Sequence, residues 1–310
     1  MPTKLEGPGP FHEGEITLQV ATGEREAGAG NGRIIADGLP PNAGGFIARQ
    51  ELAALATVDG EGRPWCSLLL GPAGSFTALD AGRLALRRAA ARADDPLWAN
   101  LARDRRVGLV FLEVASRRRY RVNGRVADPG ADPLVVEIAE ALGNCPKYIT
   151  RRQLTIEEVG QGPAGAATAG AGPDLGPAER AIIAAADLAF VASANPAGQL
   201  DASHRGGRPG FVEWREGRLW IPDYPGNSMF MTLGNLAVHP AAGLLFMDFT
   251  GGQALQLTGT TALDLDVPDG DAAPTGGTGR AWTLTPQRWR RAPFPAPVQA
   301  GLLELSPFNP

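Results

Sequence analysis

The sequence predicts a mainly β protein with a few helices, in which two copies of one small β-barrel unit follow each other along the chain. Three observations lead to this fold class. The length of 310 residues suits two domains of ordinary size. Short landmarks recur at a nearly constant spacing, and each copy contains many short strand-like segments with one helix.

The repeat is visible as matching segments. Leu52–Gly62 matches Leu188–Gly198 at a distance of 136 residues, and both segments have the pattern of a strand that runs into a turn. Four further matches lie 135 residues apart: Gly82–Leu84 with Gly217–Leu219, Asn100–Ala102 with Asn235–Ala237, Gly108–Phe111 with Gly243–Phe246, and Gly124 with Gly259. Several separate landmarks at one spacing indicate that a whole unit was duplicated.

Within the first copy, alternating or apolar runs bounded by turn residues predict the strands. The predicted strands are Leu55–Val58, Trp65–Leu70, Ser75–Ala78, Arg83–Leu86, Val107–Val114 and Arg119–Val126. Asp95 and Pro96 predict a helix start, because Asp suits the N-cap and Pro the first turn. The second copy repeats this order, with a helix expected around Met231–Val238.

These elements divide the chain into three parts. Residues 1–159 form the N-terminal unit, which includes an N-terminal extension and a predicted inter-unit helix at Ile138–Leu142. Residues 160–178 are rich in Gly, Ala and Pro and are expected to be a flexible linker. Residues 179–310 form the C-terminal unit, in which a second Gly-rich patch, Val267–Gly279, is expected to be a surface loop.

Composition excludes several classes of function. The net charge of −4 argues against nucleic acid and anionic membrane surfaces as partners, and no apolar run is long enough to span a membrane, so we expect a cytoplasmic protein. Two cysteines and three histidines lie at no metal-ligand spacing, so no metal site is expected. The phosphate-loop, nucleophile-elbow and dinucleotide motifs are missing. If the chain is an enzyme, a bound cofactor carries the chemistry.

The densest candidate site is Asp201–Val212 in the second copy, where a hairpin strand enters a Gly-rich turn. Such turns present backbone N–H groups to an anion, and arginines add charge-assisted donors. The candidates here are Ser203, His204, Arg205, Gly206 and Arg208. Downstream, Asn227, Ser228 and Thr232 lie in a tight turn before a helix N-terminus, which also favours an anion. The alternative is that the glycines only shape β-turns and the arginines are solvated.

His204 is the weak candidate for proton transfer, against the alternative that it is a hydrogen-bonded structural residue. The corresponding segment of the first copy, Cys66–Gly71, has no basic residue, so we expect one copy to have kept the site. A second basic run, Arg117–Arg121, starts the last long strand of the first copy, and strand alternation places Arg117, Arg119 and Arg121 on one face. It is either a solvated edge or the other wall of the second copy's site.

Taken together, these segments resemble the pyridoxamine 5′-phosphate oxidase-related FMN-binding split-barrel family, in its tandem-repeat branch. The resemblance rests on Asp201–Val212, Ile221–Asn227 and Gly243–Phe249, with Phe11–Glu15, Asn144–Ile149 and Ser306–Pro310 elsewhere in the chain. It implies six-stranded split barrels that pair as an internal pseudo-dimer and hold FMN at their interface.

The resemblance also implies roles for residues. Ser203–Arg205 would meet the FMN phosphate and ring edge, Asn227–Thr232 would complete the phosphate site, and the strand at Arg119 would contact the ring. Trp289 and Arg291 are similar to a Trp and Arg found near the substrate in the oxidase proper. Many relatives have two basic residues after Pro-Gly-Asn, where this chain has Ser228 and Met229. We therefore expect Arg117 and Arg119 of the first copy to supply the missing positive charge.

The function implied is an FMN-dependent oxidoreductase that acts on a small molecule, and not pyridoxamine phosphate oxidation itself. A small-molecule substrate or electron donor is then the expected partner, and a homodimer of whole chains stays open. Two alternatives remain at this point: a non-enzymatic protein that binds flavin, haem or another anion, and a scaffold whose site has degenerated.

Overall fold

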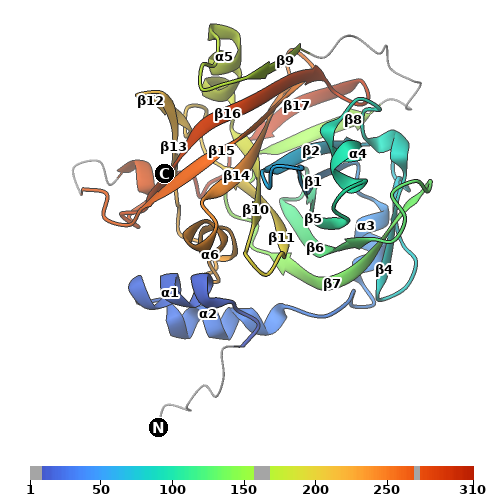
Figure 1. Cartoon of the computed structure of the whole chain (residues 1–310), viewed down its shortest axis with the longest axis horizontal. Coiled ribbons are helices and arrows are strands. Elements are labelled where there is room, and N and C mark those ends of the chain that lie inside the picture. The colour runs from blue at the N-terminus through green and yellow to red at the C-terminus, as the bar shows by residue number, and fades with distance from the viewer. Residues whose placement is uncertain (1–8, 157–167, 269–272) are drawn as a thin grey trace.

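A computed structural model describes residues 9–156, 168–268 and 273–310, and in it the chain forms two large antiparallel sheets, one in each half (Figure 1). The first sheet has the strand order β2-β1-β5-β6-β7-β4-β3. Its strands are β1 (Leu52–Val58), β2 (Pro64–Leu70), β3 (Phe76–Ala78), β4 (Arg83–Leu86), β5 (Arg106–Glu113), β6 (Arg118–Val126) and β7 (Leu134–Asn144).

The second sheet has the order β11-β10-β14-β15-β16-β13-β12, with β9 (Thr168–Ala171) paired to β16. Its other strands are β10 (Leu188–Ala194), β11 (Leu200–Gly206), β12 (Glu213–Arg215), β13 (Arg218–Pro222), β14 (Ala241–Asp248), β15 (Gln253–Asp264) and β16 (Ala281–Pro293). Element by element, this order repeats that of the first sheet, so the predicted duplication and the mainly β tandem fold are confirmed. Each sheet has seven strands in this order, where the family resemblance implied six.

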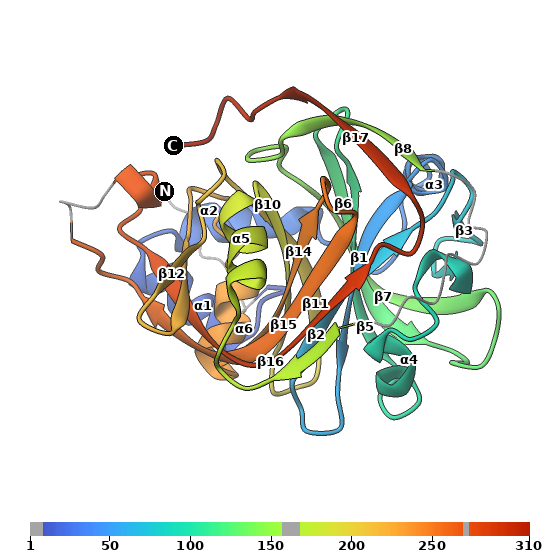
Figure 2. The same ribbon diagram turned by 90° about the horizontal axis from the view of Figure 1, so that it is seen from above.

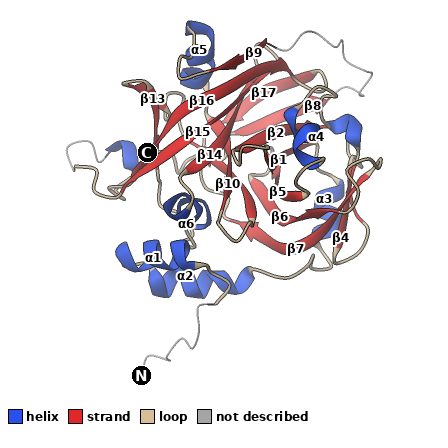
Figure 3. Cartoon of the chain, in the orientation of Figure 1, coloured by secondary structure: helices blue, strands red, loops and turns tan. Residues whose placement is uncertain are grey.

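Helices are few and lie around the sheets (Figure 3). They are α1 (Glu13–Ala21), α2 (Arg25–Asn31), α3 (Ala43–Ala48), α4 (Pro96–Leu101), α5 (Pro177–Ala185) and α6 (Met231–Val238). The helices predicted once in each copy of the repeat are α4 and α6, which occupy equivalent places in the two halves. Asp95 caps α4 by accepting a hydrogen bond from the Leu97 backbone N–H at 3.0 Å, as its position predicted. No helix within the described ranges is long and apolar enough to cross a membrane.

The predicted inter-unit helix at Ile138–Leu142 is wrong, because this segment belongs to β7. Its Glu, Ala and Leu residues favour a helix locally, but Ala141 pairs with Val122 of β6 and Leu142 with Arg121. Part of the predicted linker is also ordered. Residues 168–171 form β9 against β16, and α5 begins at Pro177, whereas residues 157–167 lie outside the described residues. The connection is completed by a two-stranded sheet of β8 (Arg151–Ile156) and β17 (Val298–Glu304).

The two halves pack through reciprocal contacts, as an isologous dimer interface does. Strand β2 contacts β14 and β15, and its equivalent β11 contacts β5 and β6 (Figure 2). Gly108 and its repeat partner Gly243 make this approach possible. A Cβ at Gly108 would lie 2.8 Å from the backbone of Asp201, and one at Gly243 would lie 2.6 Å from the carbonyl of Pro64. The internal pseudo-dimer therefore places strands of both units side by side at one interface.

This interface has its own apolar core, distinct from the core inside each barrel. Leu52, Val110, Phe190 and Leu245 are among its buried residues, and each is at most 1% exposed. Separate clusters around Phe111 in the first unit and Trp282 in the second fill the two barrels. Three packed cores hold the strands that form the site in fixed positions.

Candidate functional site

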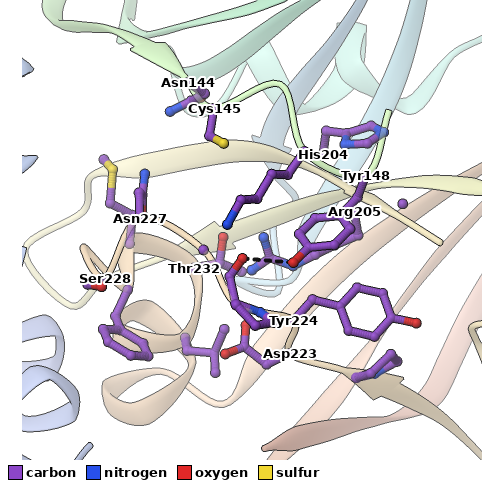
Figure 4. Close-up of a pocket in the computed structure, with 18 of the residues that line it drawn as sticks. Asn144, Cys145, Tyr148, His204, Arg205, Asp223, Tyr224, Asn227, Ser228 and Thr232 are labelled. Carbon is purple, nitrogen blue, oxygen red and sulfur yellow. Dashed lines mark hydrogen bonds between the residues drawn. The ribbon is translucent and has the colours of Figure 1, made fainter. Parts of the chain in front are cut away.

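A pocket lies between the two units, where β6 and the connection after β7 face β11, β13 and the start of α6 (Figure 4). In Figure 4, Asn144 at the end of β7 and Cys145 just after it face Asp223, Tyr224 and Thr232 of the second unit across the pocket. The structure brings several sequence-predicted residues to this one pocket: Arg119, His204, Arg205, Gly206, Asn227, Ser228 and Thr232. Their roles in binding remain predictions.

The first unit contributes two arginines through strand alternation in β6. Arg119 Nη1 donates to the backbone carbonyl of His204 at 3.3 Å and lies 3.2 Å from His204 Nδ1. Arg121 Nη1 lies 2.8 Å from the Asp201 carboxylate in a buried ion pair. The basic run therefore reaches across the unit interface to β11, and for Arg119 and Arg121 the solvated-edge alternative does not hold.

Arg205 and Arg119 are the two guanidinium groups of the pocket that form no ion pair with a carboxylate of the described residues. Within the described part of the chain, the Arg205 side chain makes no ion pair or hydrogen bond, and the buried Nε atoms of both arginines have no acceptor. Burial lowers the pKa of both groups, and repulsion from Arg121 and Arg205 adds to the effect on Arg119. At Arg205 the negative charges of Asp223 and Asp201 act in the opposite direction and raise the pKa, although neither carboxylate forms an ion pair with it.

A count of charges gives the same result. The five basic side chains that line the pocket are Arg119, Arg121, Lys147, Arg205 and Arg280. Three carboxylates pair with two of them: Asp201 with Arg121, and both Glu24 and Asp223 with Arg280. The pocket thus keeps two positive charges in excess, which matches the charge of a phosphate monoester near neutral pH.

The start of α6 adds backbone donors to the same wall. Its N-cap residue, Phe230, makes no side-chain cap, so the first N–H groups of the helix have no side-chain acceptor at that position. Thr232 lines the pocket, and its hydroxyl lies 2.8 Å from that of Ser203. An uncapped helix start beside unpaired arginines favours an anion.

His204 lies at the back of the pocket and is only 2% exposed. Burial, with the positive charges of Arg119 and Arg205 beside it, holds the pKa of its imidazole well below the usual value. Its ring packs edge-on against Phe190, and Nδ1 faces the Arg119 donor, which assigns the ring proton to Nε2. This environment opposes a role in proton transfer near neutral pH and suits a residue that orients Arg119.

Tyr148 and Tyr224 form an aromatic wall of the pocket, although the sequence did not single out either tyrosine as a site residue. Their ring centroids are 5.0 Å apart, and the Tyr148 hydroxyl donates to the Pro225 carbonyl at 2.9 Å. Burial raises the pKa of each phenol to about 12, so both stay protonated donors at physiological pH. Gly206 permits this arrangement, because a Cβ there would lie 1.9 Å from the Tyr148 carbonyl oxygen. The Asn144–Ile149 motif was the only signal in the sequence for Tyr148.

Several predicted residues lie elsewhere. Arg117 precedes β6 and has a left-handed φ of 55°, so strand alternation does not apply to it, and it binds the Ile149 carbonyl and the Glu304 carboxylate instead. Arg208 is exposed and donates to the Pro310 carbonyl at 3.1 Å. Ser203 is buried behind Thr232.

The two residues compared with the oxidase's substrate site also lie outside the lining of this pocket. Arg291 pairs with Glu179 of α5 at 3.0 Å, and Trp289 packs against the core of the second unit.

The equivalent place in the first unit is already filled. Asp95 accepts hydrogen bonds there from Ser67 Oγ at 2.6 Å and from Gln256 Nε2 at 3.3 Å. By strand register, Gln256 stands where the other site has Arg121, and Leu69 stands where it has Arg205. A buried carboxylate with its own donors thus occupies the first unit's counterpart, which supports one ligand site per chain.

Comparisons with known proteins agree with the resemblance seen in the sequence. Residues 39–144, which lie within the first unit, match the family model of pyridoxamine 5′-phosphate oxidase. No curated protein matches the chain. Among the described residues, no group of three or more His, Cys, Asp or Glu side chains could hold a metal ion.

Solved structures match single units of the chain. A putative pyridoxamine 5′-phosphate oxidase from Lactobacillus delbrueckii is 23% identical and covers 34% of this chain and 95% of its own, with a TM-score of 0.28. HutZ, a haem storage protein from Vibrio cholerae, is 11% identical over 36% of this chain and 90% of its own, with a TM-score of 0.28. A pyridoxamine 5′-phosphate oxidase-related FMN-binding protein from Nostoc punctiforme is 11% identical over 39% and 86%, with a TM-score of 0.27.

Proposed function

We propose that this chain binds one FMN in the pocket between its units and acts as an oxidoreductase on a small molecule. The match of residues 39–144 to the family model of pyridoxamine 5′-phosphate oxidase supports the proposal. The observation that carries it is a pair of guanidinium groups that form no ion pair with a described carboxylate, Arg119 from one unit and Arg205 from the other, beside the start of α6, which has no side-chain cap.

The pocket's donors fit a phosphate monoester. Arg205, the Thr232 hydroxyl and the first N–H groups of α6 would hold the phosphate, and Arg119 would supply the charge that Ser228 and Met229 lack. Lys147 is a further cation of the first unit's wall. A ligand without an anionic group would leave two positive charges buried and unmatched, which is costly.

When bound, FMN supplies hydride and electron transfer at its ring. The chain's own residues bind, orient and enclose. His204 holds the Arg119 guanidinium, Arg121 is fixed by Asp201, and the hydrogen bond from Tyr148 to Pro225 closes the pocket from the side of the inter-unit connection. The proposal assigns no catalytic side chain, because burial and the two neighbouring arginines hold the pKa of His204 well below its usual value.

An absorbance spectrum of the purified protein, with analysis of the cofactor released on denaturation, tests the proposal. We expect the visible spectrum of a flavin and release of FMN, and then NAD(P)H-dependent reduction of the bound flavin. A colourless protein that does not take up added FMN would contradict FMN binding. Bound FMN that no reductant or small molecule turns over would contradict the oxidoreductase and leave a flavin-binding protein, and a haem spectrum would favour the haem-binding alternative.

A further inference from the structure

The N-terminal extension, residues 12–31, lies outside both barrels and packs against α6 (Figure 1). Neither the repeat nor the pocket's main walls account for it. It contacts the pocket through the turn of residues 227–230, which leads into α6.

The extension forms three side-chain hydrogen bonds with this turn, one at each of three successive residues. Asn31 Nδ2 donates to the Asn227 carbonyl at 2.8 Å, and Gln19 Nε2 donates to the Met229 carbonyl at 3.1 Å. Between them, the Ser228 hydroxyl donates to the Glu24 carboxylate at 2.6 Å. The back of the turn is therefore fixed by residues that the barrels do not provide.

The turn needs such support because its backbone is strained. Ser228 has φ of 59° and Phe230 has φ of 58°, a left-handed conformation that side chains other than glycine rarely adopt. Such residues persist only where the surrounding structure holds them, and they gather at ligand sites. The direction of the first N–H groups of α6 depends on this turn.

Glu24 also links the turn to Arg280 and Asp223, which lie on the same wall of the pocket, in the second unit. Its carboxylate also accepts a hydrogen bond from Arg280 Nη1 at 2.7 Å, and Arg280 Nε in turn donates to Asp223 at 3.0 Å. It is also the one residue of the extension that lines the pocket itself, within the part of the chain that is described.

We propose that the N-terminal extension is a positioning element of the anion site, and that Glu24 is its main positioning residue, acting through Ser228 and Arg280. The proposal rests on the function proposed above, since the site it positions is the FMN phosphate site. Two basic residues after Asn227 would bind the phosphate directly through their charge. This chain has Ser228 and Met229 there, and in our proposal the extension instead holds the turn in the position that binds the phosphate.

Affinity for FMN, measured by flavin fluorescence titration in Glu24→Ala, Glu24→Gln and Glu26→Ala, tests Glu24. Glu26 is exposed two residues further along α2, so its substitution removes the same charge without touching the turn. Because loss of preorganisation weakens binding, we expect Glu24→Ala to raise the Kd on the order of tenfold and Glu26→Ala to leave it unchanged. Glu24→Gln keeps groups that can bond to Ser228 and Arg280, and should restore most of the affinity.

Other patterns overturn the proposal. If Glu24 acted only as a negative charge near the ligand, both Glu24 variants would bind FMN more tightly than the wild type. If Glu24 only stabilised the fold, both Glu24 variants would have a lower thermal stability, but their Kd for FMN would equal that of Glu26→Ala. The wild-type titration separates these outcomes from failure of the proposed function, since absence of binding there concerns FMN and not Glu24.

A second measurement uses the reciprocity of coupled equilibria. If the extension positions the site, FMN must stabilise the docked extension to the same degree. We expect FMN to slow backbone deuterium exchange in α1 and α2 of the wild type, and to slow it much less in Glu24→Ala at saturating FMN. Equal protection in both, or none in either while FMN is bound, would overturn the proposal.

Discussion

Replacing Arg119 with Ala should have opposite effects on stability and on ligand binding. In the free protein the Arg119 guanidinium is a partly buried charge without a carboxylate partner, and Arg121 and Arg205 repel it. Its removal relieves that cost, so the free energy of unfolding of the ligand-free protein should stay the same or rise. A site that is destabilised in the free protein in order to bind an anion behaves in this way.

The magnitude for binding follows from the contact that is lost. One charge-assisted hydrogen bond to a phosphate contributes about 1.5–3 kcal/mol, which raises the Kd for FMN by roughly ten- to a hundredfold. Arg118→Ala is the matched control, because Arg118 is the preceding residue of β6 and points to the other face, 4.9 Å above the Phe46 ring. Its loss should cost about 0.5–1 kcal/mol of stability and leave the Kd unchanged.

The assay pairs flavin fluorescence titration of both variants with chemical unfolding in the absence of FMN. Equal and negligible changes in Kd for Arg119→Ala and Arg118→Ala would refute the composite site. A large loss of ligand-free stability in Arg119→Ala would refute the argument that its charge is unmatched.

Two further predictions follow from the same structure. Arg205→Ala should weaken FMN binding by about 1.5–3 kcal/mol. Arg208→Ala removes only an exposed contact with Pro310 and should leave the affinity unchanged. Equal losses of affinity in the two titrations would be inconsistent with the site described. Burial raises the pKa of Glu15 to about 8 from 4.5, so the folded state holds a proton there that the unfolded state has lost between those values. The free energy of unfolding of the wild type should therefore fall as pH rises through this window and level off above about 8. Glu15→Gln should lack this pH dependence. If the free energies of unfolding of the two proteins changed in parallel from about pH 5 to 8.5, the prediction would be contradicted.

Local sequence patterns were enough to predict most of the barrel strands and both helices that follow the repeat. Turn residues marked the ends of the strands. Because landmarks such as Gly108 and Gly243 recur in both copies, a strand predicted in one copy could also be placed in the other. Strand alternation predicted that Arg119 and Arg121 share one face of the strand, but it left open whether that face is solvated or meets the second unit. The segment Ile138–Leu142 was mispredicted because pairing with β6 outweighs the helix preference of its residues.

The rest of the site depends on contacts that no local pattern encodes. Tyr148 reaches Pro225 across 77 residues, and Arg280 reaches Glu24 across 256. Arg117 belongs by sequence to the basic run, but its left-handed backbone turns it away from the pocket. The closure of the first unit's counterpart also depends on Asp95 and Gln256, which come from different units and meet only in the folded chain.

The central claim is that the duplicated fold keeps one composite anion site, completed by Arg119 and Arg205, while Asp95 fills its counterpart. The stoichiometry of FMN binding, measured by calorimetric titration of the purified wild-type chain, tests this claim most directly. We predict one FMN bound per chain. Two per chain, or none, would contradict it.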